Sequence, residues 1–169
     1  MKFDVQPADR SNLEKVSEVL IDAASWLESI GRPLWDVKKL NPGELKKEYD
    51  LGIYYLGTLE GEPVGVFRFQ MKDEWVWPEF DHSEATYIHR LSVKRKFAGK
   101  GYSHLLIDVA ISESKKRKRK FLRLDCDADR PELVEYYKKA GFKYHSFAQV
   151  GKFSAARFQM ELARTRQLV

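Results

Sequence analysis

Cysteine is almost absent from this sequence, because Cys126 is the single one among 169 residues. One cysteine cannot form an internal disulfide, which excludes a disulfide-stapled secreted scaffold and fits a reducing compartment. No apolar run approaches the roughly 18 residues that a membrane-spanning helix needs. The segment Met1–Val5 has no secretory pattern and predicts a first strand. We therefore expect a cytoplasmic protein without a membrane partner.

A strong excess of one charge is also missing: 30 basic and 25 acidic residues give a formal net charge of +5. The one concentrated region is the basic run from Lys115 to Lys120. It is either a solvated last helical turn that complements the helix dipole, or a surface for nucleic acid or an acidic partner. Because it has no interleaved aromatic side chains to stack on bases, we favour the solvated turn and do not expect nucleic acid as a partner.

What the sequence does contain is a series of helix and strand patterns sized for one domain over 1–169. Apolar residues at helical spacing follow Ser11, which forms a capping-box pattern with Glu14. Asp129 and Glu132 form a second capping-box pattern, and Gly141 is placed to end the helix that follows. The expected helices are 12–29, a short one starting at 41–44, 102–117, and one from about 129 to 140.

Strand patterns surround these helices. Gly61 separates two alternating segments and predicts a hairpin at 60–62. The expected strands are 2–6, 53–60, 63–71, 85–93, 121–125, 143–150 and 153–162. The order β-α-α-β-β-β-α-β-α-β-β indicates an α/β fold with a mixed, largely antiparallel sheet of about seven strands and four helices.

The loop from Phe97 to Ser103 joins a predicted strand to a predicted helix and contains Gly99 and Gly101. Loop amides and the helix N-terminus form an anion site, to which the helix dipole adds about half a positive charge. Glycine lets a phosphate approach the backbone without a β-carbon in the way. Basic side chains lie close by in sequence: Lys94, Arg95, Lys96 and Lys100. The loop therefore favours a polyphosphate-bearing ligand; a packing turn without a ligand is the alternative.

Two nucleotide fingerprints do not fit this loop. A P-loop needs serine or threonine directly after its lysine, and here Gly101 follows Lys100. A dinucleotide fingerprint needs a third glycine where His104 stands, and it follows the first strand of the chain. Both the P-loop and the dinucleotide-binding fingerprint are therefore excluded.

Two long segments resemble the GNAT acetyltransferase family. YIHRLSVKRKFAGKGYSHLLIDVAISESKK resembles its fourth strand, pyrophosphate loop and following helix, and FLRLDCDADRPELVEYYKKAGFKYH resembles its fifth strand, fourth helix and sixth strand. WLESIGRPLW resembles the linker between the first two helices in a bacterial subgroup. The resemblance implies a GNAT fold, acetyl-CoA as co-substrate without a metal, and acetyl transfer to a primary amine of a small molecule or peptide by direct attack in a ternary complex. A GNAT-fold module that binds CoA without turnover is the alternative.

The family's loop pattern is Gln or Arg, two residues, Gly, one residue, and Gly or Ala. Gly101 takes the central glycine, while Ala98 and Ser103 depart from the first and last positions. The resemblance further implies that strand 85–93 splays from its neighbour after about Leu91 and pairs there with the pantetheine arm. Arg130 stands where many members have a cofactor-contacting asparagine. The expected cofactor-binding residues are Leu91, Ser92, Val93, Lys96, Ala98, Gly99, Lys100, Gly101, Tyr102, Ser103, His104 and Arg130.

Tyr137 falls where the family places its general acid, four residues before Gly141. A phenol with a pKa near 10 is suited to protonate a departing thiolate. For the base we choose His89, because imidazole titrates near neutral pH; a structural histidine is the alternative, and Glu84 acting through a water is another candidate. We assign Tyr136 to packing.

Other reactive side chains give weaker signals. Asp125 and Asp127 flank Cys126 and would raise its pKa, which makes it a poor nucleophile. The four histidines show no zinc spacing, so we expect no metal. In the resembled family the linker between the first two helices and nearby loops line the acceptor pocket, which makes Trp26, Trp35 and Trp77 candidates for substrate binding; core packing is the alternative for each of them. The C-terminal strands could pair in a homodimer.

Overall fold

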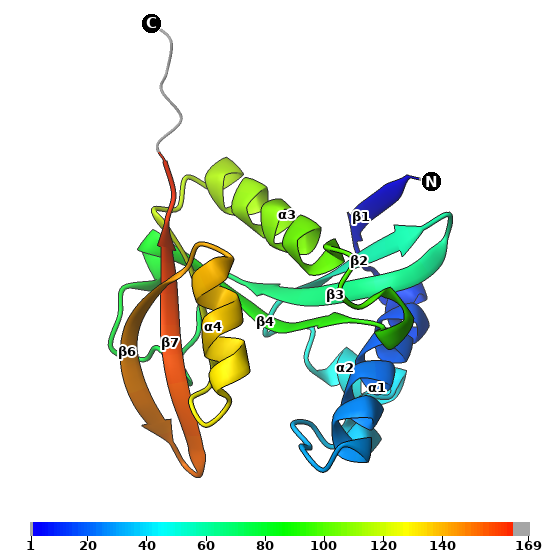
Figure 1. Ribbon diagram of the computed structural model, residues 1–169. Helices are drawn as coiled ribbons and strands as arrows, with labels where there is room; N and C mark the ends of the chain where they lie inside the picture. Colours follow the sequence, from blue (N-terminus) through cyan, green and yellow to red (C-terminus); the bar gives the residue numbers. More distant parts are fainter. Residues whose placement is uncertain (1, 164–169) are drawn as a thin grey trace, which may run out of the picture. The chain divides into compact units, whose positions relative to one another are not determined.

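The computed structural model describes residues 2–163 (Figure 1). The strands in this part are β1 (Phe3–Pro7), β2 (Ile53–Leu59), β3 (Glu62–Gln70), β4 (Ala85–Val93), β5 (Phe121–Asp127), β6 (Lys143–Val150) and β7 (Phe153–Glu161). The α-helices are α1 (Leu13–Ser29), α2 (Pro42–Lys47), α3 (Tyr102–Lys116) and α4 (Pro131–Lys139). Short 3-10 turns are η1 (Arg10–Asn12), η2 (Val37–Lys39), η3 (His82–Glu84) and η4 (Arg95–Phe97).

The strands form one seven-stranded sheet in the order β1-β2-β3-β4-β5-β7-β6. The pairs β1/β2, β2/β3, β5/β7 and β6/β7 are antiparallel, and β4/β5 is parallel. The predicted mixed, mostly antiparallel sheet with four helices is therefore confirmed, and predicted element bounds differ from the observed ones by a residue or two. Within residues 2–163, no helix is both long and apolar enough to cross a bilayer.

The chain divides into two compact units. The first comprises the residues up to Phe69 together with Arg90–Val109, and the second comprises Gln70–His89 together with the chain from Ala110 onward. Each unit is described separately below. The prediction of one domain over 1–169 stays a prediction.

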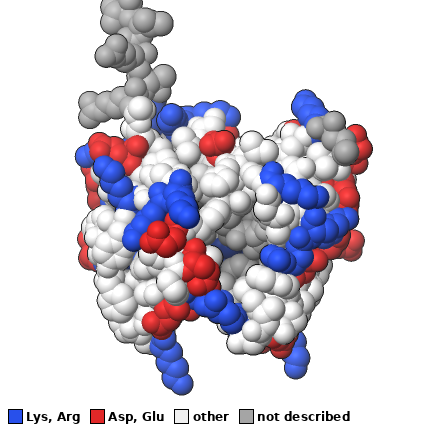
Figure 2. Space-filling model, in the orientation of Figure 1, with Lys and Arg blue, Asp and Glu red and all other residues white. Residues whose placement is uncertain are grey.

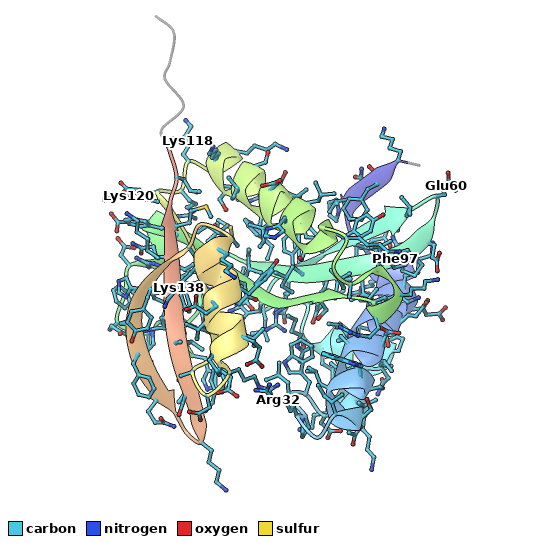
Figure 3. All side chains as sticks on the ribbon, in the orientation of Figure 1. Arg32, Glu60, Phe97, Lys118, Lys120 and Lys138 are labelled. Atoms are coloured by element: carbon cyan, nitrogen blue, oxygen red, sulfur yellow. The ribbon has the colours of Figure 1, made fainter. Side chains whose placement is uncertain are left out.

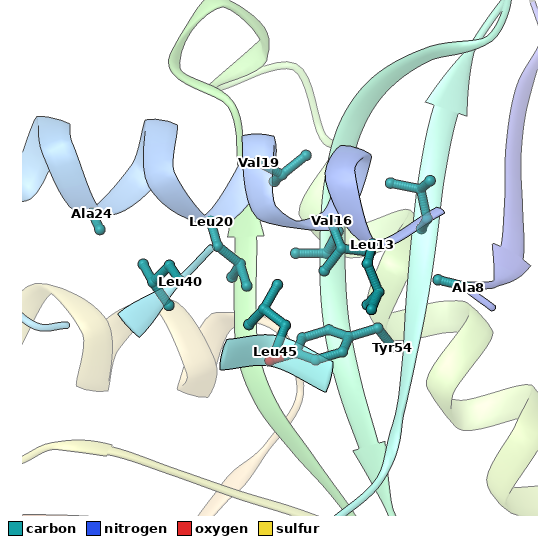
Figure 4. Close-up of a cluster of buried hydrophobic side chains, with 11 residues drawn as sticks. Ala8, Leu13, Val16, Val19, Leu20, Ala24, Leu40, Leu45 and Tyr54 are labelled. Atoms are coloured by element: carbon teal, nitrogen blue, oxygen red, sulfur yellow. The ribbon is translucent and has the colours of Figure 1, made fainter. Parts of the chain in front are cut away.

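The first unit has its core between α1, α2 and β2 (Figure 4). Val16 and Leu20 of α1 pack with Leu45 of α2 and Tyr54 of β2, and all four are buried. The Ser17 hydroxyl donates a hydrogen bond of 2.6 Å to the Leu40 carbonyl, which ties α1 to the chain before α2. Burial of each large apolar side chain contributes roughly 1.5–3 kcal/mol, so this cluster fixes α1 on the strands.

Helix α3 lies close against two glycines in the same unit. Gly57 of β2 pairs with Gly65 of β3. A β-carbon on Gly65 would lie 2.8 Å from the Leu106 side chain and 2.9 Å from the Ser92 carbonyl oxygen. The close approach of α3 to the sheet therefore requires glycine at this position.

The predicted hairpin between β2 and β3 is confirmed, with Glu60 at its tip (Figure 3). Glu60 and Gly61 both have positive φ, 51° and 85°, as a two-residue type I′ turn requires.

Trp77 lies at the centre of the core of the second unit. It has no exposed surface and packs with Val76, Ala85 and Tyr87. The guanidinium carbons of two buried arginines, Arg123 and Arg157, lie 5.1 and 5.0 Å from the centre of its ring. Such cation–π contacts stabilise most when they are shielded from water.

The two predicted capping boxes do not form. Asp9 accepts the Ser11 N–H at 2.8 Å, and Asp127 accepts the Asp129 N–H at 3.0 Å. Neither α1 nor α4 has a side-chain hydrogen bond from its N-cap residue. In both places an aspartate two residues upstream satisfies a backbone amide first, because Asx turns compete with helix caps. Gly141, with φ 97°, does end α4 as predicted.

Candidate functional site

The glycine loop belongs to the first unit and has the backbone geometry of an anion site. Gly99 and Gly101 have φ values of 73° and 84°, and a β-carbon on either would meet no atom within 4 Å. The Gly101 carbonyl accepts the N–H groups of His104 and Leu105 at 3.1 and 3.3 Å, so α3 starts directly at Tyr102. Its first turn contains no acidic side chain. The N-terminus of α3 and the open loop are therefore suited to a phosphate.

Most of the basic residues near the loop have partners on neighbouring elements. Lys94 forms an ion pair with Glu18 of α1, and Lys96 forms one with Glu62 of β3. The Arg95 guanidinium lies 3.7 Å from the centre of the Trp26 ring. Lys94 and Arg95 therefore brace η4 against α1, whereas the exposed Lys96–Glu62 pair is of the weak surface kind, from which Lys96 can turn to a ligand at little cost.

The remaining predicted loop residues occupy distinct positions. The Tyr102 ring packs between Phe3 and Phe97, with centroid distances of 4.9 and 5.8 Å. The ammonium of the exposed Lys100 lies 5.6 Å from the centre of the Phe97 ring, and Phe97 itself lies in η4 (Figure 3). Ala98 and Ser103 are half-buried, and His104 is exposed. The predicted residues from Lys96 to His104 thus lie on η4, on the glycine loop and at the start of α3, all in the first unit.

Strand β4 stops pairing with β5 earlier than expected. Their parallel ladder runs from Ala85–Phe121 to Ile88–Leu124, so it ends three residues before Leu91. Arg90, which follows soon after, has φ 53°, a left-handed conformation inside a strand. Leu91 and Val93 are half-buried and Ser92 is buried, its hydroxyl donating to the Arg90 carbonyl at 3.3 Å. The sequence predicts that the two strands separate after about Leu91. In the structure their pairing ends at Ile88, before the left-handed Arg90.

Tyr137 lies on α4 in the second unit. Its half-buried ring packs against Tyr136, Phe142 and Phe158, with centroid distances of 5.2, 6.0 and 6.1 Å. Burial raises the pKa of Tyr137 above that of an ordinary phenol, and the neighbouring Cys126, Tyr136 and Asp125 add to the shift. The phenol therefore stays protonated at neutral pH, as a proton donor must.

His89 lies between two carboxylates in the same unit. Its Nε2 is 2.9 Å from Asp73 Oδ2, and its Nδ1 is 3.9 Å from Asp125 Oδ1. Three of these atoms are shielded from water: His89 Nε2, Asp73 Oδ2 and Asp125 Oδ1. In the described chain they have no hydrogen-bonding partner outside this cluster. The three side chains lie close enough to hold a cation. However, Asp73 approaches Nε2 and Asp125 approaches Nδ1, and one cation binds only one nitrogen of an imidazole. The geometry therefore favours protons between the ring nitrogens and the carboxylates over a bound cation.

The two carboxylates differ in their acidity. Burial raises the pKa of Asp125 to about 6, and the nearby Asp73 adds to the shift, while His89 and Arg157 oppose it. Burial also acts to raise the pKa of Asp73, but the contact with His89 and N–H groups from Val76 and Trp75 outweigh it, so that pKa is lowered. Sequence reasoning missed this cluster because its members come from three separate elements.

Other predicted side chains are less well placed for chemistry. Glu84 is exposed in η3, five residues before His89 and thus roughly 16 Å away along an extended strand. Burial raises the pKa of Cys126 to about 12, with Asp125 and Asp127 adding to it, as expected of a poor nucleophile. Arg130 is buried, with Nε 3.2 Å from Asp127 Oδ2, which favours a structural role over phosphate contact.

The three tryptophans proposed for substrate binding have different surroundings. Trp35 lines an open hollow of about 420 Å³ between the end of α1 and η2. Trp26 is half-buried, and Arg95 covers its ring. Trp77 has no exposed surface because Arg123 and Arg157 enclose it, so the prediction that it contacts the acceptor is wrong.

The basic run forms the end of α3 and the turn that follows. Lys116 and Arg117 both pair with Glu113, and Arg119 donates to the Ser83 carbonyl. On the face in view in Figure 2, lysine and arginine side chains are interspersed with acidic ones. These contacts tie the run to Glu113 of α3 and to η3.

Comparison with known proteins identifies the family of this chain. The sequence profile of the "Acetyltransferase (GNAT) family" matches residues 20–142. The chain is 26% identical over 148 residues to the "Uncharacterized N-acetyltransferase YesJ" of Bacillus subtilis (strain 168), covering 84% of this chain and 82% of that protein.

Solved structures show the same fold. A GNAT-family acetyltransferase from Listeria monocytogenes superposes with a TM-score of 0.77 at 26% identity, covering 95% of both chains. The acetyltransferase yncA from Salmonella typhimurium, solved with acetyl-CoA, has a TM-score of 0.69 at 14% identity, covering 98% of this chain and 96% of that one. With the family profile matched over most of its length, the chain belongs to the GNAT family of acetyl-CoA-dependent acetyltransferases.

Proposed function

We propose that this protein is an N-acetyltransferase that passes the acetyl group of acetyl-CoA to a primary amine of a small molecule or peptide by direct attack in a ternary complex. The observation that carries the proposal is the glycine loop, open at Gly99 and Gly101 and followed at once by α3, in a chain of the acetyltransferase family. The YesJ relative is named as an N-acetyltransferase, which agrees with an amine acceptor.

The residues of the loop fit the cofactor. The pyrophosphate would be held by backbone N–H groups of residues 99–103, since the space where β-carbons would stand at Gly99 and Gly101 is open. Lys96 and Lys100 are exposed and supply positive charge beside it. Ala98 provides no polar side chain, so the backbone carries most of this contact. The backbone of Leu91 and Val93 would hold the pantetheine arm.

When bound, acetyl-CoA supplies the thioester that the amine attacks. Tyr137 acts as the general acid: its hydroxyl donates a proton to the sulfur as the carbon–sulfur bond breaks, while the new carbon–nitrogen bond forms. Because the pKa of Tyr137 is raised, its proton is present throughout the physiological pH range. The main-chain N–H of Leu91 polarises the thioester carbonyl.

His89 takes up the proton that the amine loses. Asp73 and Asp125 orient its ring from both sides and stabilise the charge that the ring gains. A direct contact with the amine requires that one nitrogen be released from its carboxylate, and Nδ1 is the candidate because its carboxylate is the farther one. Trp35, beside the hollow that follows α1, contacts the acceptor.

A thiol-release assay with acetyl-CoA against polyamines, amino acids, aminoglycosides and N-terminal peptides tests the proposal. We expect turnover with at least one amine and mass-spectrometric detection of its acetylated product. Calorimetric titration with CoA runs in parallel. CoA binding without thioester consumption across the panel would contradict the proposal and support the non-catalytic module.

A further inference from the structure

Arg90 has a backbone conformation that is unusual for its place in the fold. The described residues other than glycine with positive φ are Glu60, Arg90 and Lys118. Glu60 and Lys118 lie in turns, whereas Arg90 lies within β4 with φ 53°. A side chain other than glycine adopts this conformation at a steric cost, so surrounding contacts must hold it there.

Those contacts are present in the same unit. Arg90 Nη1 donates to Glu48 Oε2 at 2.8 Å and Nη2 donates to Glu48 Oε1 at 2.9 Å, which is a two-pronged pair. Nη1 also donates to the Tyr54 hydroxyl at 2.9 Å, and Arg68 donates to Glu48 Oε2 at 2.8 Å. The side chains of Arg90 and Glu48 are 17% and 24% exposed, and Tyr54 is buried.

The partners of Arg90 come from firmly packed elements. Glu48 directly follows α2, whose Leu45 is in the core of the first unit, and Tyr54 is a member of the same core cluster. The guanidinium is therefore anchored to the fold by a rigid fork, and its geometry cannot be reproduced by a lysine. The next residue along the chain is Leu91, whose orientation follows from the dihedral angles of Arg90.

From these contacts we infer that Glu48, Arg90 and Tyr54 form a positioning device that holds β4 in its left-handed conformation and thereby aims the Leu91 N–H at the thioester carbonyl. The three side chains act through the backbone and touch neither the acyl group nor the amine. This role rests on the proposed function, because it assigns a reacting partner to the Leu91 N–H.

Four variants test the device. Glu48→Gln removes the charge that holds the guanidinium. Arg90→Ala removes the guanidinium but keeps a β-carbon in the strained conformation, whereas Arg90→Gly removes both the guanidinium and the strain. Glu44→Gln is the matched control, because Glu44 makes an exposed pair with Lys47 on α2 and has no contact with Arg90.

Steady-state kinetics gives the first readout. We expect Glu48→Gln and Arg90→Ala to lower kcat about tenfold or more with the dissociation constant of CoA changed by less than about threefold, as for loss of an interaction made only in the transition state. Arg90→Gly should be at least about fivefold faster than Arg90→Ala, since glycine adopts the conformation freely. Equal rates for these two variants, or wild-type kcat in Glu48→Gln, would overturn the inference.

Amide NMR of the Leu91 N–H separates this inference from the proposed function. If the wild type consumes no thioester with any amine, the proposed function fails. The NMR spectrum alone then tests whether the pair of Glu48 and Arg90 sets the backbone at Leu91. The Leu91 resonance should then move in Glu48→Gln, and stay near its wild-type position in the control Glu44→Gln. An unmoved resonance in Glu48→Gln would show that the pair does not set the backbone.

Discussion

At the scale of single residues, the surroundings of a side chain decide its role more than its type does. We propose that His89 of β4 is the base that takes up the proton of the amine. The structure adds Asp73 and Asp125, one beside each ring nitrogen. Their sequence positions are 16 residues before and 36 residues after His89, and no local pattern links them.

Asp125 gives a prediction for stability. Its pKa is about 6 in the folded protein and 3.8 in an ordinary environment. Between these values the folded state binds more protons than the unfolded state, so the free energy of unfolding falls as pH rises from about 4 to 6. Asp125→Asn cannot ionise, and we expect it to lose about 2 kcal/mol less than the wild type between pH 4 and 7.

Urea denaturation of both proteins at pH 4, 5, 6 and 7 measures this difference. Asp108→Asn, which removes an exposed carboxylate from α3, is the control and should follow the wild type. If the free energies of unfolding of wild type and Asp125→Asn changed in parallel with pH, the pKa of Asp125 would not be raised in the folded protein.

At the scale of elements, the glycine loop was predictable because its signal is local. Two glycines, a preceding strand and a following helix occur within a few residues, and the structure gives both glycines positive φ. The brace behind the loop was not predictable in the same way. From sequence, Lys94 and Arg95 only add positive charge near the loop. In the structure they contact Glu18 and Trp26 of α1, some 70 residues earlier.

Gly101→Ala tests the loop itself. The added methyl group has open space around it, so its effect is the strain of a left-handed alanine, about 1 kcal/mol. Because the added β-carbon also obstructs the phosphate, we expect the dissociation constant of CoA to rise about tenfold by calorimetry. Gly61→Ala in the β2–β3 hairpin has a matching φ and open space, and should cost similar stability with unchanged CoA binding. Equal CoA affinity in the two variants would argue against phosphate at this loop.

Substitution of Trp26 and of Trp35 should affect the KM values of different substrates. Trp35 lines the hollow after α1, so Trp35→Ala should raise KM for the amine by roughly tenfold with little change for acetyl-CoA. Trp26 stacks on Arg95, so Trp26→Ala should loosen η4 and raise KM for acetyl-CoA instead. Initial rates at varied concentrations of each substrate give both constants, and an amine effect confined to Trp26→Ala would reverse these assignments.

At the scale of the whole molecule, hydrophobic periodicity and turn residues predict the order of strands and helices along the chain, and the structure has that order. The details that depend on distant partners did not follow. Trp77 read as a pocket residue, yet two arginines of β5 and β7 enclose it. The pattern at 85–93 predicts a regular strand, yet Arg90 within it has a left-handed conformation and contacts Glu48 and Tyr54. Sequence patterns report local geometry, whereas these contacts are set by tertiary packing.

We propose that Tyr137 is the proton donor in acetyl transfer. The most direct test of this role is kcat of Tyr137→Phe, compared with wild type and with Tyr136→Phe, which keeps the neighbouring ring on α4. We expect Tyr137→Phe to lower kcat about 100-fold or more with unchanged CoA affinity, and Tyr136→Phe to stay near wild type. Wild-type kcat in Tyr137→Phe, measured with the best amine of the panel, would show that Tyr137 does not donate the proton.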